Sequence, residues 1–219
     1  QISNRNMKTR KIRTALYNVL PGEKAHALMA PRPKYIEGIE GVHPCPPVNS
    51  AILALIVPFE NELALPLIKR VNRGKYHGGQ IAFPGGKMEK EDADALQTAL
   101  RECHEEIGVP EEKVSILGVL SDIYIPLSNF NITPIVGTTL QLPDFILSQD
   151  EVEKVILVKL RDLFDDRNKT THSFVRHDHK IIAPGYKIGE NFIWGATAMI
   201  IAELEQLMKT NTFNHLGKL

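Results

Sequence analysis

Three glutamates close together in the middle of the chain could do chemistry: Glu102, Glu105 and Glu106. On a helix that turns about 100° per residue, their side chains fall within about 100° of one another. Apolar residues between Leu96 and Ile107 form a separate stripe that can pack on a core. The cluster has two readings. It is either a solvated acidic face or a site for a hard cation, which binds carboxylate oxygens and keeps water ligands for phosphate.

The residues around these glutamates favour the cation site. Gly85 and Gly86 precede the helix, and glycine lets the backbone turn tightly and bring a bare carbonyl next to the carboxylates. Arg101 lies at the edge of the cluster, where its guanidinium can orient a glutamate through charge-assisted hydrogen bonds. We therefore predict that Mg²⁺ or Mn²⁺ is bound by four ligands: the Gly85 carbonyl, Glu102, Glu105 and Glu106.

The stretch Arg101-Glu-Cys-His-Glu-Glu-Ile-Gly-Val109 resembles the second half of the Nudix hydrolase signature, with Cys103 in an aliphatic place. The first half of the signature departs from the pattern. Fifteen steps separate Gly86 from Arg101, one more than in the signature, and Ala93 stands where a glutamate is expected. The longer loop offers two replacements for that carboxylate, Asp92 and Asp94.

The residues upstream are similar to one branch of this family, the coenzyme A pyrophosphatases. The run His77-Gly-Gly-Gln-Ile-Ala-Phe-Pro-Gly-Gly86 carries the resemblance, together with Arg70, nine residues before Gly79. Val71 and Lys75 depart from the residues usual in that branch, a serine and an arginine. Residues 125–137 and 193–198 also resemble it, so the likeness extends from about Val48 to Leu207.

The resemblance implies an α/β fold, the Nudix-type α/β/α sandwich with a mixed sheet. It also implies metal-dependent hydrolysis of coenzyme A or its thioesters to 3′,5′-ADP and phosphopantetheine or its acyl form. The metal would lower the pKa of a bound water, and Glu105 or Glu151 would take the proton. Glu151 is a candidate because many members of this family use a glutamate from a loop near the C-terminal end of the domain. We predict that Arg101 acts in catalysis with these two, and that substrate phosphates contact Arg70, Lys75 and His77.

Two alternatives stay open at this point. One is a pyrophosphatase of another nucleoside diphosphate derivative, such as ADP-ribose or a dinucleotide. The other is a Nudix-fold binding or regulatory module without catalysis. The departure at Ala93 favours this second alternative, whereas the retention of Glu102 and Glu106 argues against it.

Composition sets limits on partners and compartment. The 219 residues are 43% hydrophobic, enough for one substantial core. Lys plus Arg equals Asp plus Glu at 26 each, so no global field indicates nucleic-acid or membrane binding. No apolar run reaches the roughly 18 residues of a spanning helix. Two cysteines, Cys45 and Cys103, make no disulfide framework, and a cytoplasmic protein with a small nucleotide substrate is expected.

The elements that must position the site can be placed from periodicity. We predict an N-terminal segment, 1–47, with a helix at 8–20 and a Pro- and Gly-rich arm at 25–47 that offers a contact for a homodimer. A Nudix domain follows at 48–219. Its predicted strands are 51–57, 63–68, 80–83, 114–125, 132–140, 152–160 and two or three between 172 and 193. Its helices are 93–108 and 196–209, and a turn is expected at 161–164.

Other candidate residues are read as structural. Cys103 lies on the apolar stripe and is expected in the core. Trp194 is expected to pack at the start of the last helix. His177 and His179 could face the same way on a strand, but no further ligand stands near them in the sequence, so no zinc site is predicted there.

Overall fold

A computed structural model describes residues 2–32, 45–72, 79–176 and 179–213. In these residues a mixed eight-stranded sheet forms the centre of the molecule. Its strands are β1 (Val48–Phe59), β2 (Glu62–Arg70), β3 (Ile81–Ala82), β4 (Gly85–Lys87), β5 (Ser115–Val119), β6 (Ile123–Ile125), β7 (Phe130–Thr138) and β8 (Val152–Lys159). β1 pairs with β7 in parallel and with β2 and β4 antiparallel, so the predicted mixed sheet is confirmed.

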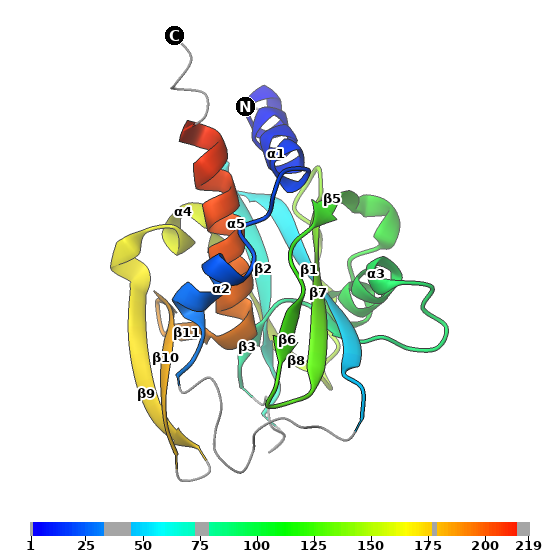
Figure 1. The fold of residues 1–219 in the computed structure, drawn as a ribbon. Helices are drawn as coiled ribbons and strands as arrows, with labels where there is room; N and C mark the ends of the chain where they lie inside the picture. Colours follow the sequence, from blue (N-terminus) through cyan, green and yellow to red (C-terminus); the bar gives the residue numbers. More distant parts are fainter. Residues whose placement is uncertain (1, 33–44, 73–78, 177–178, 214–219) are drawn as a thin grey trace.

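Helices cover both faces of this sheet (Figure 1). α3 (Ala95–Ile107) packs on one face, and α1 (Ile2–Leu16), α2 (Glu23–Met29) and α5 (Gly195–Phe213) lie on the other. Helices are needed on both faces because the buried side chains of β1 point alternately to one face of the sheet and the other. Leu53 and Leu55 join the cluster under α3, and Ala54 and Ile56 join the cluster under α1 and α5. The predicted α/β/α sandwich is therefore confirmed.

A second sheet stands beside α5. It has three strands in the described part of the chain, β9 (Lys169–Arg176), β10 (His179–Ile188) and β11 (Asn191–Trp194), in the order β11-β10-β9. Tyr186 and Ile193 from this sheet enter the core on the α5 side. The prediction of two or three short strands between residues 172 and 193 is confirmed. Trp194 packs edge-on against Phe174 of the same sheet, with ring centroids 4.8 Å apart.

The N-terminal segment differs from its prediction. α1 begins and ends earlier than the predicted helix at 8–20, and a second helix, α2, stands within the region predicted as an irregular arm. Ile12, Leu16 and Met29 pack in the same core as the sheet, and α2 lies along α5. Arg32 then pairs with Ile182 of β10 through two backbone hydrogen bonds. The remainder of the arm, 33–44, lies outside the described residues, and the domain boundary at residue 47 stays a prediction.

Two further predictions from the sequence are corrected by the structure. The predicted strand 114–125 is two strands, β5 and β6, separated at residues 120–122, where Ser121 hydrogen-bonds to Glu203 of α5. The predicted turn at 161–164 is a one-turn helix, α4 (Leu160–Leu163), and short 3₁₀ turns occupy Glu111–Lys113 and Asp166–Asn168. None of the helices in the described segments is long and apolar enough to cross a membrane.

Candidate active site on α3

Local sequence fixes both ends of α3. The Asp94 carboxylate accepts a hydrogen bond from the Gln97 N–H at 2.9 Å, and the Gln97 side chain accepts one from the Ala93 N–H at 2.7 Å. Asp94 therefore caps the helix, and the Gln97 side chain ties the preceding residue to the first turn. At the other end Gly108 adopts a left-handed φ of 71°, and its N–H donates to the His104 carbonyl. Cys103 and Ile107 are fully buried on the sheet side, as predicted, so the glutamates are held on a rigid frame.

Gly85 enters the site because the segment before α3 is itself a strand. β4 pairs with β1, with Gly85 opposite Ile52. Gly85 has a φ of 154°, and a Cβ built on it would overlap the Ala51 carbonyl oxygen. Only glycine therefore fits this close approach. The pairing carries the Gly85 N–H to a position 2.9 Å from Glu106 Oε2, to which it donates a hydrogen bond.

Glu106 is a buried carboxylate with an unfilled bonding capacity. It is 1% exposed, and its Oε1 has no hydrogen-bond partner. Among the residues that the structure describes, Arg70 forms an ion pair with Glu106: its Nη2 lies 3.5 Å from that oxygen, without hydrogen-bond geometry. Burial raises the pKa of Glu106 to about 7, although the Arg70 charge and the Gly85 N–H both oppose the rise. A buried acceptor left in this condition is unusual in native proteins and requires an explanation.

Glu102 lies one helical turn before Glu106, under Gly86. A Cβ built on Gly86 would overlap the Glu102 carboxylate, so the glycine leaves room for that side chain. Burial raises the pKa of Glu102, while Arg101 opposes the rise and the charges of Glu105 and Glu151 add to it. Two partly desolvated carboxylates of α3 therefore face the backbone of β4.

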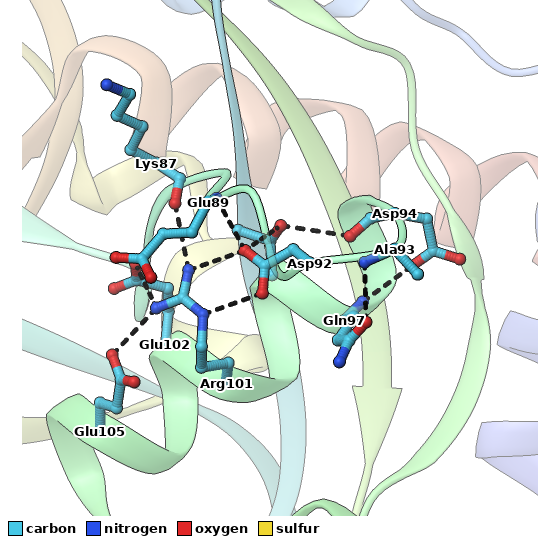
Figure 2. Close-up of polar contacts among 10 residues, drawn as sticks. Lys87, Glu89, Asp92, Ala93, Asp94, Gln97, Arg101, Glu102 and Glu105 are labelled. Atoms are coloured by element: carbon cyan, nitrogen blue, oxygen red, sulfur yellow. Dashed lines mark hydrogen bonds and ion pairs between the residues drawn. The ribbon is translucent and has the colours of Figure 1, made fainter.

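Arg101 is the centre of the polar contacts shown in Figure 2. Its guanidinium donates two hydrogen bonds of 2.9 Å to Asp92, one from Nε and one from Nη2. Nη1 donates to Glu102 and to Glu105, each at 3.0 Å, and Nη2 also reaches the Lys87 carbonyl at 3.1 Å. Arg101 thus lies between Asp92 on one side and two of the site glutamates on the other.

The structure decides between the two candidate replacements for the absent glutamate. Asp92 is 7% exposed and also accepts hydrogen bonds from the Glu89 N–H and the Thr98 hydroxyl. The hydrogen bonds from Arg101 hold the pKa of Asp92 well below its usual range. Asp94 does not contact Arg101 in this arrangement, because it caps α3. Asp92 is therefore the carboxylate that holds Arg101. Its two side-chain partners, Thr98 and Arg101, are six and nine residues later in the sequence.

The three site glutamates do not form a closed metal cluster in this structure. Glu102 and Glu105 are drawn to Arg101, whereas Glu106 turns to Gly85. In the ranges that the structure describes, no three His, Cys, Asp or Glu side chains lie close enough together to hold a metal ion. The donors nonetheless fit a hard cation. Glu106 Oε1 is buried and unfilled, and the carboxylate of Glu102 lies against the glycine backbone.

The remaining predicted residues differ in how they are placed. Glu105 is held by Arg101 from an exposed position. Glu151 precedes β8, and its charge is among the causes that raise the pKa values of Glu102 and Glu106, so it lies near both. Arg70 is directed at Glu106. Lys75 and His77 lie outside the described residues. The roles of all the predicted site residues stay predictions.

The chain is similar to known proteins in sequence and in fold. The family model described as the NUDIX domain matches residues 49–177. The uncharacterized Nudix hydrolase NudL of Enterobacter sp. (strain 638) is 34% identical over 161 residues, covering 72% of this chain and 82% of that protein. NudL of Pectobacterium atrosepticum is 35% identical over 158 residues, covering 71% and 80% respectively. A solved Nudix hydrolase from Nitrosomonas europaea aligns with a TM-score of 0.49 at 20% identity, covering 80% of this chain and 76% of that chain.

Proposed function

The chain belongs to the Nudix hydrolase family, and on that premise we propose that it hydrolyses the pyrophosphate bond of coenzyme A or its thioesters with Mg²⁺ or Mn²⁺. The family is one of pyrophosphohydrolases that use divalent metal ions. Within this family, we propose which substrate and metal ion the protein uses and which residues bind them. The products would be 3′,5′-ADP and phosphopantetheine or its acyl form.

The observation that carries the proposal is the state of Glu106. A purely structural buried carboxylate would be expected to have both oxygens hydrogen-bonded, and Oε1 is not. Its position between Gly85 and Arg70, next to Glu102, suits a divalent cation and the phosphate that accompanies it. We assign the metal to Glu102, Glu106, Glu105 and the Gly85 carbonyl. When bound, the metal would neutralise the phosphates and lower the pKa of a water.

Side chains of the protein would orient the metal ligands, accept the proton of the attacking water and contact the substrate phosphates. Arg101, held by Asp92, would keep Glu102 and Glu105 oriented. Glu151 would take the proton of the attacking water, because Glu105 is already occupied by Arg101, whereas Glu151 makes no side-chain hydrogen bond or ion pair to another described residue. Arg70 would meet a substrate phosphate with its planar guanidinium, as we also propose for Lys75 and His77.

The coenzyme A assignment is supported by how two parts of the upstream motif meet. Arg70 stands nine residues before Gly79, and the two segments run side by side at this point. The Gly79 N–H donates to the Arg70 carbonyl at 2.9 Å, and the Arg70 N–H donates to the Gln80 carbonyl at 3.0 Å. The arginine and the Gly-Gln-Ile-Ala run therefore form one surface beside Glu106. We propose a cytoplasmic location from the two free cysteines and a homodimer through the Pro- and Gly-rich arm at 25–47.

One experiment tests this proposal. The pure protein is incubated with coenzyme A, ADP-ribose, diadenosine polyphosphates and NADH, each with Mg²⁺ or Mn²⁺, and products are identified by mass. We expect 3′,5′-ADP from coenzyme A and no turnover in EDTA. Turnover of ADP-ribose with coenzyme A untouched would contradict the substrate assignment. Failure to turn over any of the four would contradict catalysis on this set.

A further inference from the structure

An open cavity of about 640 Å³ adjoins the carboxylate site. We call it the aliphatic groove and define it by the residues that line it: Val71, Ile146, Leu147, Gln149, Val152 and Glu153. Its volume lies within the range of roughly 300–1,000 Å³ that is usual for ligand pockets. None of the predicted site residues that the structure describes lines it.

One wall of the groove is fixed to α3 itself. The Ile146 N–H donates to the Ile107 carbonyl and the Ser148 N–H to the Glu106 carbonyl, both at 3.0 Å. These carbonyls belong to the last turn of the helix, which has no intrahelical partners for them. The loop 146–149 therefore completes the helix end, and the wall is held at a constant place relative to Glu106.

The floor of the groove is tied to both Arg70 and Glu151. Val71 follows Arg70, and its N–H donates to the Glu151 carbonyl at 2.9 Å. A β-bulge lies here, since Lys69 pairs with Lys154 but Arg70 pairs with Val152, which leaves Glu153 as the extra residue. The bulge keeps Val152 and Val155 on the α3 side although they are three residues apart. The groove thus begins one residue from the proposed phosphate contact and one from the proposed base.

The described lining suits an alkyl group better than the nucleotide half of the substrate. Its four apolar side chains are aliphatic, so the described lining has no ring that could stack on a purine. The only charged residue in this lining is Glu153, whose carboxylate is paired with Lys69 at 2.7 Å. A 3′-phosphorylated ADP carries several negative charges and would find no cationic side chain among these lining residues. An uncharged, flexible alkyl group gains from burial on such a surface.

We infer that the aliphatic groove binds the pantetheine arm and the acyl chain of a coenzyme A thioester. This inference rests on the proposed function and deepens it, because it makes acyl forms better substrates than free coenzyme A. Each methylene that becomes fully buried would raise kcat/KM by up to about fourfold.

Binding without the nucleotide tests the groove separately from catalysis. Octanoyl-phosphopantetheine is titrated calorimetrically into the wild type, Ile146→Glu and Leu140→Glu. Ile146 is 73% exposed and Leu140 is 85% exposed, so both variants are expected to fold, but only Ile146 lines the groove. We expect Ile146→Glu to weaken binding about tenfold or more and Leu140→Glu to leave it unchanged. No binding by the wild type, or equal binding by all three proteins, would overturn the inference.

A turnover series separates the groove from the proposed function. The wild type is assayed with coenzyme A and its acetyl, butyryl, hexanoyl and octanoyl thioesters. We expect KM to fall with chain length in the wild type and to be nearly constant in Ile146→Glu, with kcat little changed. A wild-type KM independent of chain length would overturn the inference. Groove-dependent binding of octanoyl-phosphopantetheine with no hydrolysis of any thioester would sustain the groove and reject the proposed function.

Discussion

Two glutamates of this protein are almost equally buried and have opposite surroundings. Glu203, in the middle of α5, is 0% exposed, and Glu106 of α3 is 1% exposed. Glu203 accepts hydrogen bonds from the Gly22 N–H at 3.0 Å, the Ser121 hydroxyl at 2.6 Å and His26 at 2.9 Å. Glu106 accepts one, from Gly85, and its second oxygen has none.

The difference appears in the acidity of the two groups. Burial would raise the pKa of Glu203, but the hydrogen bonds from His26, Ser121 and Gly22 outweigh it and leave the pKa below its ordinary value. For Glu106 burial prevails, and the pKa rises to about 7. The comparison indicates that Glu203 holds α2 and the β5–β6 connection against α5. Glu106 instead has an oxygen that is free to bind a ligand from solution.

The comparison is tested most severely by Glu106→Gln. Removing a metal ligand forfeits several kcal/mol of transition-state stabilisation, so we expect kcat to fall about 10³-fold or more. The melting temperature should be unchanged or higher, because the substitution removes a poorly compensated buried charge. Steady-state kinetics and thermal unfolding of the same preparation give both values. A large loss of stability would mean that Glu106 is structural like Glu203.

Glu203→Gln should show the reverse behaviour. The amide cannot accept all the hydrogen bonds that the carboxylate accepts, and we expect the free energy of unfolding to fall by about 3 kcal/mol. Turnover at a temperature where the variant is folded should stay near the wild-type value. Urea denaturation and the pyrophosphatase assay provide the two measurements.

The pH dependence of the stability lost in Glu203→Gln tests whether the carboxylate charge is the cause. Since the pKa of Glu203 is lowered on folding, its ionised form stabilises the protein above the unfolded value of 4.5, and this contribution is lost as the pH falls further. The stability difference between wild type and Glu203→Gln should therefore shrink below about pH 4.5. A difference that persists unchanged in acid would mean that the carboxylate charge is not involved.

Substitution of Asp92 should lower kcat, by less than Glu106→Gln does, whereas the same substitution of Asp94 should not. Asp92→Asn removes the charge that holds Arg101 through two hydrogen bonds, and we expect kcat to fall about 10- to 100-fold. Asp94→Asn should keep both rate and stability, because asparagine caps a helix about as well as aspartate. Parallel kinetics of the two variants check this. Equal rates in both variants would show that the orientation of Arg101 does not matter for turnover.

The smallest change is Gly86→Ala. The added methyl would displace the Glu102 carboxylate, which can move because it is the end of a flexible side chain. We expect kcat to fall about tenfold while the melting temperature stays within a few degrees of wild type. Kinetics with Mg²⁺ and thermal unfolding measure the two effects. A wild-type rate would show that the position of Glu102 under Gly86 is not needed.

The helix that carries the glutamates was predicted more closely than the segments around it. The helix bearing the glutamates has strong periodicity, and its cap residues stand within a few positions, so its ends were predicted to within two residues. β4 was missed because the close approach of Gly85 to β1 is a long-range contact. The choice of Asp92 over Asp94 likewise needed the position of Arg101 in space.

The N-terminal segment and the aliphatic groove show a different limit. α2 is a seven-residue helix, too short to be marked by periodicity, and it is held by its packing on α5 and by the His26–Glu203 contact. The groove joins Val71 to residues about 75 to 80 positions later through a bulge that no local pattern marks. From the sequence, Glu203 looks like one more polar residue of a helix, because its partners come from two distant segments, the start of α2 and the β5–β6 connection.

The central claim is that the unfilled oxygen of Glu106 marks a divalent-cation site. Calorimetric titration of Mn²⁺ into the wild type, Glu106→Gln and Glu203→Gln, without substrate, tests it most directly. We predict that Mn²⁺ binds the wild type and Glu203→Gln with similar affinity and binds Glu106→Gln about tenfold more weakly or not at all. Equal affinity for the wild type and Glu106→Gln would contradict the claim.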